Sequence, residues 1–398
     1  LGISQFIGRD LFASEIGRNF LALGMDSSIS RTIRFVYEGN SRSSVYMASY
    51  TPNYAGMYLV MVFPVLFVLA LQAKKIGYKI LWTCLIGILL VCLYGTGSKA
   101  GFLVCGFLAV LVIILMAQKH HTKKKWIYVG ICILAAAGIT AGYDQFSGHA
   151  LSDALQQIVQ KETYDLEEIK AESDGVCLKY RGNFLKLIPE ENEMGQTLTA
   201  QINKKEKQTA FWDGESQSFI FNDKSFGSLK FDTYREKGTQ YLIIYDGDMT
   251  WNFYKEDGAA RYVFVNQYGK LDEIQNAAAV FKGHERSLSG RGYIWGRTIP
   301  LLKKFLLWGS GPDTFTVKFP QTDYVMKVNT GLNMYQQLPT KAHSMYLQSA
   351  LQTGILSGIC LLMFFLHYIR IAVRNAKTEK NREKAMFRTG ILLSVIGF

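Results

Sequence analysis

YAGMYLVMVFPVLFVLALQA, residues 54–73, is a long run without a single charged residue. An α-helix of about 20 apolar residues crosses the hydrocarbon core of a bilayer, which is roughly 30 Å thick. Comparable runs follow at residues 80–94, 100–117 and 126–143. The sequence therefore predicts four transmembrane helices within residues 54–143, as in a polytopic α-helical membrane protein.

Two further apolar segments lie near the end of the sequence. Residues 344–369 predict another transmembrane helix, and residues 389–398 predict the start of one more. LGISQF, residues 1–6, is typical of the end of an earlier helix. We therefore expect the chain to be a fragment of a longer polytopic protein.

The net charge of +12 hides a strong segregation of charge along the chain. Residues 143–285 hold 24 of the 32 acidic residues but only 16 of the 44 Lys and Arg residues, a balance of −8. Because Lys and Arg accumulate in cytoplasmic loops, residues 74–79, 120–125 and 370–388 are predicted to be cytoplasmic. This topology explains the basic loops without a nucleic-acid partner. The segments then predicted to lie outside the cytoplasm are residues 1–53, 94–101 and 144–343.

The outer segment 144–285 predicts a mainly-β domain inserted between membrane helices. After a helical stretch at residues 153–171, about eight short segments rich in β-branched and aromatic residues recur at roughly 10-residue spacing, which favours an antiparallel sandwich or jelly roll. It contains a single cysteine, Cys177, so no disulfide framework is expected. Some of its aromatic residues either stack on sugar rings or form ordinary core and cross-strand pairs, and both readings stay open. These residues are Trp212, Tyr241, Tyr245, Trp251 and Tyr254.

Ionisable residues at the outer membrane boundary are candidates for chemistry, because such positions are costly to keep charged. Lys99 stands in the glycine-rich turn GSKAG, which is either an anion site or a loop with a snorkelling lysine. Arg291 precedes a predicted interfacial helix, where a guanidinium suits phosphate, although the helix also reads as a plain membrane anchor. His343 precedes the helix expected at residues 344–369 and suits either proton transfer or a hydrogen bond to a loop carbonyl.

Several of these motifs together resemble one known family. SGRGYIWGRTIPLL at residues 289–302 and KAHSMYLQSALQTGILS at residues 341–357 resemble the outer loop and following helix of the O-antigen ligase and polymerase superfamily of membrane glycosyltransferases. SRSSVYMASYTPNYAGMYL at residues 41–59 and YGTGSKAGFL at residues 94–103 are similar to two further family patterns. The chain looks like a Gram-positive type of member carrying an extracytoplasmic insert, and the resemblance implies a GT-C-like fold with residues 286–343 as the catalytic outer loop.

The resemblance also implies an activity and its site residues. Such enzymes take a glycan from a polyprenyl-diphosphate-linked oligosaccharide and pass it to a glycan, wall, lipid or protein acceptor, with inversion and without a metal or another cofactor. His343 would be the general base, and Arg291 and Arg42 would bind the diphosphate. Lys99, standing where an arginine is usual, would assist. Lys341 and Arg297 are possible supporting residues.

Polymerase and ligase remain equally open at this point, and so do two other classes of protein. A transporter or flippase of lipid-linked oligosaccharide would also place cations near the interface, and a non-enzymatic surface receptor would use the β-rich domain. The favoured prediction is a multi-pass protein of a bacterial plasma membrane for cell-surface polysaccharide biosynthesis, with its active site and β-rich domain extracytoplasmic.

Overall fold

The computed structural model describes most of the chain and divides it into two compact units. One unit is Leu1–Asp153 with Met363–Phe398, and the other is Ala154–Leu362. The described residues are 1–11, 14, 45–47, 52–118, 130, 133–134, 137–138, 140–142, 144–145, 147–192, 195–203, 205, 207–215, 217–221 and 223–397. Most of the transmembrane helix expected at residues 126–143 lies outside them.

The first unit is helical and packs around one central helix, α4. Helix α4 contacts α5, α6 and α14, and it buries Leu59, Phe63 and Val68 in their shared apolar core. The bounds of α4, α5 and α6 follow from long apolar runs and lie close to the runs seen in the sequence, whereas α14 begins at Arg382, before the apolar segment expected at residues 389–398. The helices are α1 Gly2–Phe6, α4 Pro52–Gln72, α5 Ile76–Gly95, α6 Lys99–Gln118 and α14 Arg382–Gly397.

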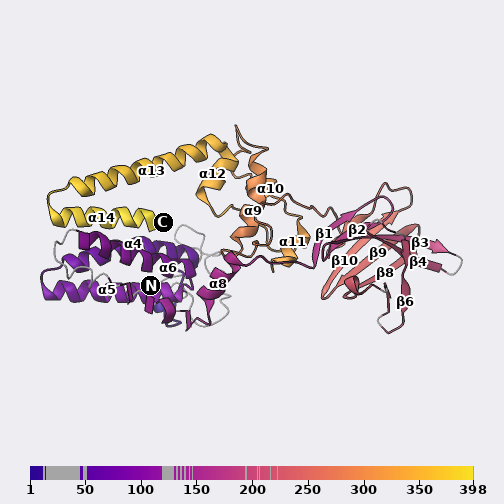
Figure 1. Cartoon of the computed structure of the whole chain (residues 1–398), viewed down its shortest axis with the longest axis horizontal. Coiled ribbons are helices and arrows are strands. Elements are labelled where there is room, and N and C mark those ends of the chain that lie inside the picture. Colours follow the sequence, from indigo (N-terminus) through magenta and orange to yellow (C-terminus); the bar gives the residue numbers. More distant parts are fainter. Residues whose placement is uncertain are drawn as a thin grey trace. The chain divides into compact units, whose positions relative to one another are not determined.

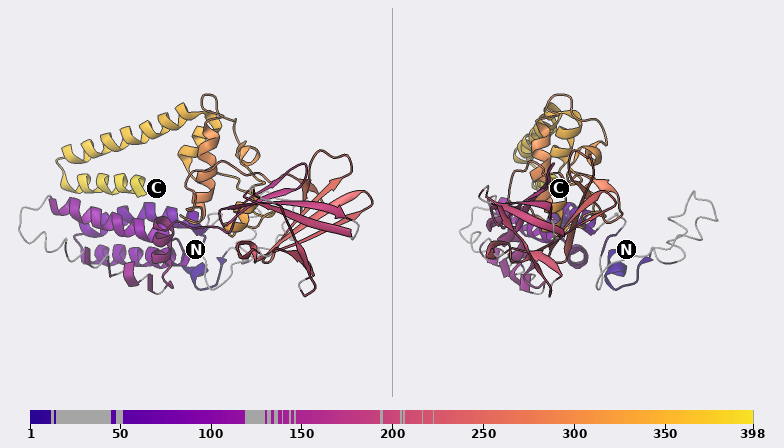
Figure 2. Two further views of the ribbon diagram at one scale, coloured as in Figure 1. Left: turned by 45° about the vertical axis from the view of Figure 1, so that its right-hand side comes forward. Right: turned by 90° about the vertical axis from the view of Figure 1, so that its right-hand side faces the viewer.

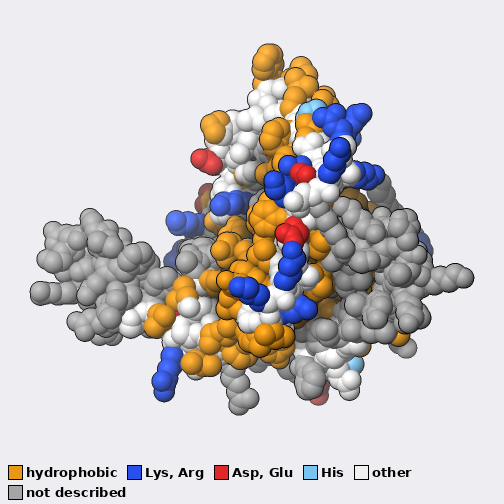
Figure 3. Space-filling view, turned by 90° about the vertical axis from the view of Figure 1, so that its left-hand side faces the viewer, with side chains coloured by type: hydrophobic (Ala, Val, Ile, Leu, Met, Phe, Trp, Pro, Cys, Tyr) orange, Lys and Arg blue, Asp and Glu red, His pale blue; other side chains and the backbone are white. Residues whose placement is uncertain are grey.

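The predicted cytoplasmic and outer loops gather at opposite ends of helix α5. At its first end, Lys74 Nζ lies 2.7 Å from a carboxylate oxygen of Glu383 on α14. At its last end, the carbonyl of Gly95 accepts a hydrogen bond from the N–H of Val45, in the predicted outer segment. Figure 3 shows many Lys and Arg side chains and few acidic ones among the apolar side chains.

Among the described residues, three helices are long and apolar enough to cross a membrane. They are Pro52–Gln72, Ile76–Gly95 and Ile355–Thr378, the last being helix α13. With the two sheets described next, they fit a membrane protein with a β-rich domain. Helix α13 continues past residue 369, so only residues 379–381 separate it from α14 instead of the long basic loop expected at 370–388.

The second unit contains two antiparallel sheets in which neighbouring strands are consecutive along the chain. Figures 1 and 2 show the long strands of the larger sheet side by side. The described strands follow a plain meander in each sheet, which is simpler than the jelly roll considered from the sequence. The smaller sheet is β1 Leu166–Ala171, β2 Val176–Tyr180, β3 Asn183–Asn192, β4 Gly195–Ile202 and β5 Lys207–Thr209. The larger is β6 Phe211–Asp213, β7 Ser218–Ile220, β8 Leu229–Glu236, β9 Thr239–Asp246, β10 Met249–Glu256, β11 Val263–Val265 and β12 Leu271–Asp272.

The helix expected at residues 153–171 is confirmed in its first part and wrong in its last part. Helix α8, Ala150–Val159, covers its first part, but residues 166–171 form β1 and pair with β2. A shift of register between Leu166 and Glu168 lets Leu166 and Ile169, three residues apart, both reach the core. Because a bulge makes buried positions recur at helical spacing, the sequence pattern indicated the wrong element.

The aromatic residues of the insert divide between core and surface. Trp251 is 1% exposed and packs in the core that the two sheets share. Tyr241 stacks on Tyr234 of the neighbouring strand, with ring centroids 4.6 Å apart, while Trp212 is 53% exposed. Core packing and cross-strand pairing therefore account for most of the aromatic residues singled out in the sequence.

The remaining segment of the second unit is built from short helices. Helix α9 packs against α12, α10 also contacts α12, and α11 packs on strand β1. Tyr293, Phe315 and Leu351 form the centre of a separate small apolar core among these helices. The elements are η2 Lys224–Phe226, α9 Arg291–Leu302, α10 Phe315–Lys318, α11 Tyr324–Asn329 and α12 Met345–Thr353.

Candidate active site

His343 lies on a tightly fixed turn before helix α12. The preceding residue, Ala342, is fully buried; its carbonyl accepts a 2.8 Å hydrogen bond from Trp295 Nε1, and its N–H donates a 2.7 Å bond to Gln348 Oε1. Ser344 caps α12, its hydroxyl accepting from the N–H of Leu347. These contacts from α9 and α12 hold the backbone on both sides of His343.

The backbone of His343 itself has an unusual conformation. Its φ angle is +50°, in the left-handed region that residues other than glycine seldom adopt. Such a conformation costs free energy and persists only where the surroundings enforce it, which happens often at functional sites. The side chain is exposed, so the turn presents the imidazole outward and does not bury it.

Arg291 is the first residue of helix α9, and α9 is fixed by unusually close packing. A Cβ on Gly292 would stand 2.1 Å from the carbonyl oxygen of His284, and one on Gly296 would stand 2.6 Å from that of Val280. Glycine at both positions therefore lets the backbone of the preceding segment lie directly on the helix. Arg291 is half-buried at this fixed end, where the helix dipole also favours an anion.

Electrostatics link these groups around the imidazole. The pKa of His343 is lowered from its usual 6.5, first because the surrounding protein desolvates the ring and then because Arg291 and Lys341 carry positive charge nearby. Although the residue is exposed at the surface, partial desolvation of the ring disfavours its charged form. At neutral pH the imidazole is therefore neutral and able to accept a proton.

Arg297 occupies a different environment from the one expected for a basic residue of an interfacial helix. Its side chain is 3% exposed; Nε lies 2.8 Å from Asp323 Oδ2 and Nη1 lies 3.3 Å from Glu285 Oε1. Its guanidinium also lies over the ring of Tyr293, 4.7 Å from the centroid. Desolvation raises the pKa of Asp323, while Arg297 opposes that shift. Arg297 thus joins α9 to the segments on either side of it.

The apolar side chains expected on the interfacial helix are instead most exposed after α9 has ended. Leu307 is 71% exposed and Trp308 is 89% exposed. Of the apolar residues within α9, Trp295 and Ile299 are half-buried. The helix therefore serves mainly to position the loop before α12, and the following turn carries the exposed apolar surface.

The single helix expected at residues 344–369 is two helices, α12 and α13, which meet at Gly354. Gly354 has a φ of +95°, and a Cβ there would stand 2.1 Å from the carbonyl oxygen of Leu307. The turn around Leu307 forms backbone hydrogen bonds with this break, including Ser310 N–H to Leu351 O at 2.8 Å and Ile355 N–H to Leu306 O at 2.8 Å. The break is therefore filled by a turn from more than 40 residues earlier in the sequence.

Two of the expected site residues belong to the first unit. Arg42 lies outside the described residues. Lys99 begins helix α6, and its side chain is likewise outside the described part of the chain. Of the expected residues, Arg291 and Lys341 are those whose charges act on His343.

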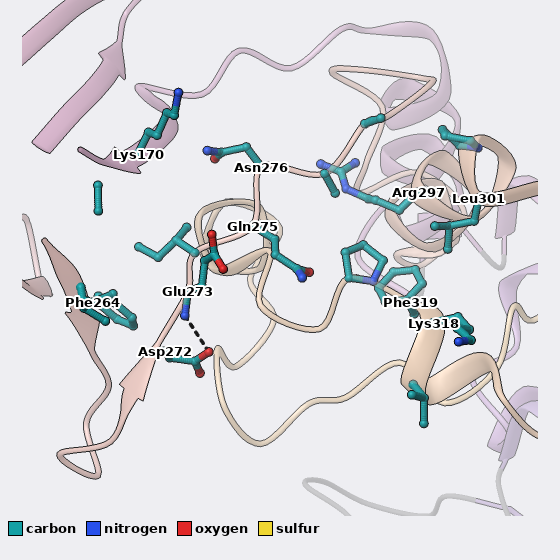
Figure 4. A pocket seen from close by; sticks show the side chains of 18 of the residues that line it. Lys170, Phe264, Asp272, Glu273, Gln275, Asn276, Arg297, Leu301, Lys318 and Phe319 are labelled. Carbon is teal, nitrogen blue, oxygen red and sulfur yellow. Dashed lines mark hydrogen bonds between the residues drawn. The ribbon is translucent and has the colours of Figure 1, made fainter. Parts of the chain in front are cut away.

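A pocket of about 550 Å³ lies elsewhere in the second unit (Figure 4). One wall comes from strands of the larger sheet and from β1, and the other from α9, α10 and their connection. Figure 4 shows Lys170 and Asp272 on one side and Arg297, Leu301 and Lys318 on the other. His343 is not among the residues that line it.

Sequence reasoning missed the residues that hold this site in place. Trp295 and Gln348, which the sequence did not mark as part of the site, both bind the backbone of Ala342. The sequence did not predict a role for Glu285 and Asp323, because their partner Arg297 lies 12 and 26 residues away from them. Within the described residues, no group of three or more His, Cys, Asp or Glu side chains has the arrangement to hold a metal ion.

Comparison with known proteins gives one match. Residues 258–362 match the family model described as O-Antigen ligase, which confirms, over this segment, the superfamily expected from the sequence. The matched segment contains Arg291, Arg297, Lys341 and His343, and it begins within the larger sheet, before strand β11. No curated protein and no solved structure matches the chain. The family implies glycan transfer of the ligase or polymerase type.

Proposed function

Taking the O-Antigen ligase segment as the premise, we propose that the chain is part of a polytopic, GT-C-like membrane glycosyltransferase. Its donor is a glycan on a polyprenyl diphosphate, and its acceptor is a hydroxyl of a glycan, wall, lipid or protein. The reaction takes place at the outer face of a bacterial plasma membrane, inverts the anomeric centre and uses no metal. The single observation that carries this proposal is the fixed turn that presents a neutral His343 beside the charge of Arg291.

The proposed reaction assigns the proton to His343. The acceptor oxygen forms a bond to the anomeric carbon while its proton passes to the neutral imidazole. The bond from that carbon to the diphosphate oxygen breaks, and its electron pair leaves with the diphosphate. A base whose pKa lies somewhat below the working pH is deprotonated before the reaction and suits this role.

Arg291 then stabilises the leaving group. A guanidinium at a helix N-terminus offers several N–H donors together with the positive end of the helix dipole. A cation that tightens on the diphosphate as its charge develops lowers the barrier to bond cleavage. Arg42 and Lys99 are proposed to contact the same diphosphate, with Lys99 acting as a point charge where an arginine would bind bidentately.

Lys341 and Arg297 support the site without contacting the reacting atoms in this proposal. The positive charge of Lys341 adds to desolvation and to the charge of Arg291 in lowering the pKa of His343. Arg297, buried with two carboxylates, fixes helix α9 and with it the position of Arg291.

Reconstitution tests the assignment. The purified protein in vesicles would receive a polyprenyl-diphosphate oligosaccharide and an acceptor, and released polyprenyl diphosphate would be measured together with the mass of the product. We expect His343→Ala to lower the rate about 100-fold or more, as for loss of a general base. His149→Ala, an exposed histidine of the first unit, is the matched control. A wild-type rate in a folded His343→Ala variant would refute the role of His343.

Arg291→Ala tests the diphosphate contact separately. We expect weaker use of the donor, seen as a higher KM or a lower kcat/KM, because the leaving group loses a charged partner. Product mass then separates long lipid-linked chains from glycan on a new acceptor. An unchanged kcat/KM for the donor would remove Arg291 from the proposal.

A further inference from the structure

The pocket of Figure 4 lies on the opposite side of helix α9 from the candidate active site. Arg297, Leu301 and Lys304 line it, at the spacing of one helix face. With 3.6 residues per turn, Arg291 and Trp295 point to the other side of the same helix. The helix thus separates two places, one beside His343 and one facing the β-rich domain.

The pocket is built by both the insert and the O-Antigen ligase segment. Lys170 and Phe253 belong to strands that precede the matched segment, whereas Arg261, Lys304 and Lys318 belong to it. A volume of about 550 Å³ is within the range of small-molecule sites. The pocket therefore needs lining residues from both the β-rich insert and the O-Antigen ligase segment.

Positive charge dominates the accessible lining of the pocket. Of its two acidic residues, Asp272 accepts from the hydroxyl of Tyr324, and Glu273 pairs with Arg261 at 3.3 Å. Lys304 and Lys318 are both exposed, and no carboxylate oxygen of the described residues lies within 4.0 Å of either ammonium group. Lys318 Nζ lies over the ring of Phe305, 5.7 Å from its centroid, so each of the two lysines lacks a carboxylate partner among the described residues but only Lys318 has a ring contact.

Neutral polar groups also line the pocket. Gln275 and Asn276 are exposed on the segment that connects the sheet to α9. Asn276 Nδ2 donates to the carbonyl of Ile169 at 2.9 Å, which fixes the side chain and leaves its amide oxygen for a ligand. Amide groups of this kind recognise hydroxyls.

The aromatic residues of the lining distinguish between classes of ligand. Phe253, Tyr262, Phe264 and Phe319 are each less than 5% exposed. Phe253, Tyr262 and Phe264 pack in the core that the two sheets share, and Phe319 packs in the small core among the helices, so none presents a free ring face for the stacking that binding of a nucleobase uses. Cations and amides without a free aromatic face together favour a sugar that carries a negative charge.

We propose that this pocket binds an acidic sugar unit of the glycan, with Lys304 and Lys318 contacting its carboxylate and Gln275 and Asn276 contacting its hydroxyls. The inference rests on the proposed function, because it identifies part of the substrate that the enzyme handles. Binding at this second face of α9 holds the chain of sugars away from the reacting bond.

Calorimetry on the full chain in detergent tests the proposal with two probes. Trigalacturonic acid is the acidic probe and maltotriose is the neutral one. We expect the acidic probe to bind at least about tenfold more tightly, and Lys304→Ala and Lys318→Ala each to weaken it about tenfold, as for loss of one charge-assisted hydrogen bond. Lys303→Ala is the matched control, because Lys303 is the exposed neighbour that does not line the pocket.

The outcomes separate this inference from the proposed function. Equal affinity for both probes, no binding of the acidic probe, or an unchanged affinity in Lys304→Ala and Lys318→Ala with a wild-type melting curve would each overturn it. Binding is measured without donor, so His343→Ala should bind the acidic probe as the wild type does. Binding without any transfer activity in the wild type would overturn the proposed function alone.

Discussion

Replacing Arg297 by methionine tests whether a buried ionic cluster holds helix α9 in place. Arg297 is 3% exposed and pairs with Asp323 and Glu285, which are each 2% exposed. Methionine keeps much of the volume of the side chain but removes the charge, so two carboxylates remain buried without their common partner.

The expected loss of stability follows from this burial. Removing one partner of a buried ion pair typically costs about 3–5 kcal/mol, because the remaining charge has been taken out of water. For a unit of the size of Ala154–Leu362, this corresponds to a decrease in melting temperature of roughly 6–20 °C. The exposed pair of Arg181 with Asp165 is the control, and Arg181→Met should leave the melting temperature close to that of the wild type.

The loss of stability in Arg297→Met should also depend on pH, in a direction set by Asp323. The pKa of Asp323 is already raised above its usual 3.8 by desolvation, and loss of the Arg297 charge raises it further. A carboxyl group whose folded-state pKa is raised destabilises the fold above that pKa and ceases to do so as falling pH protonates it. The difference in stability between the variant and the wild type should therefore shrink on acidification.

Thermal unfolding followed by intrinsic fluorescence in detergent measures the global effect, and hydrogen exchange of the amides of α9 measures the local one. Both should change in Arg297→Met and neither in Arg181→Met. If Arg297→Met unfolds within about 2 °C of the wild type and its α9 amides stay protected, the cluster does not hold the helix and the reasoning fails.

Three further predictions concern the candidate active site. The transfer rate should rise with pH through a pKa below 6.5, because desolvation lowers the pKa of His343. Lys341→Ala should move this rise in rate to higher pH, because it removes a positive charge near the imidazole, and pH–rate profiles of both proteins check it. Trp295→Phe leaves a buried carbonyl of the His343 turn unpaired, at a cost of about 1–3 kcal/mol, so kcat should fall while the fold persists in circular dichroism. Gly354→Ala meets a backbone oxygen at 2.1 Å and should expose the turn at residues 306–311 to protease, whereas Gly331→Ala, also at positive φ but in open space, should not.

The membrane helices were the part of the fold that the sequence predicted best. Apolar runs such as residues 54–73 report helix length directly, because the bilayer demands an uninterrupted stretch. The break at Gly354 could not be found in the same way. Polar residues such as Gln352 and Thr353 precede the break and apolar ones follow it, which is also the pattern of one membrane helix with a polar end. The break depends on a turn more than 40 residues away that forms hydrogen bonds with this backbone.

In the candidate site, too, features set by neighbouring residues could be predicted, whereas contacts between residues far apart in the sequence could not. His343 and Arg291 were predicted as site residues because ionisable residues stood next to apolar runs, which is a local signal. The burial of Arg297 depends on Glu285 and Asp323, and the sequence between these residues gives no sign that they meet. Strand β1 was missed for a local reason, since its bulge imitates helical spacing.

The turn that fills the break between α12 and α13 fixes two exposed apolar residues beside the start of α13. Leu306 is bonded through its carbonyl to Ile355, the first residue of a helix long enough to cross the bilayer. Leu307 and Trp308, which follow Leu306, are thereby held at the level where that helix begins, the level at which tryptophan prefers to lie in membranes. Because these hydrogen bonds join the turn to the start of α13, and α12 leads from His343 to the same break, a tilt of α13 would move Trp308 and the turn of His343 together.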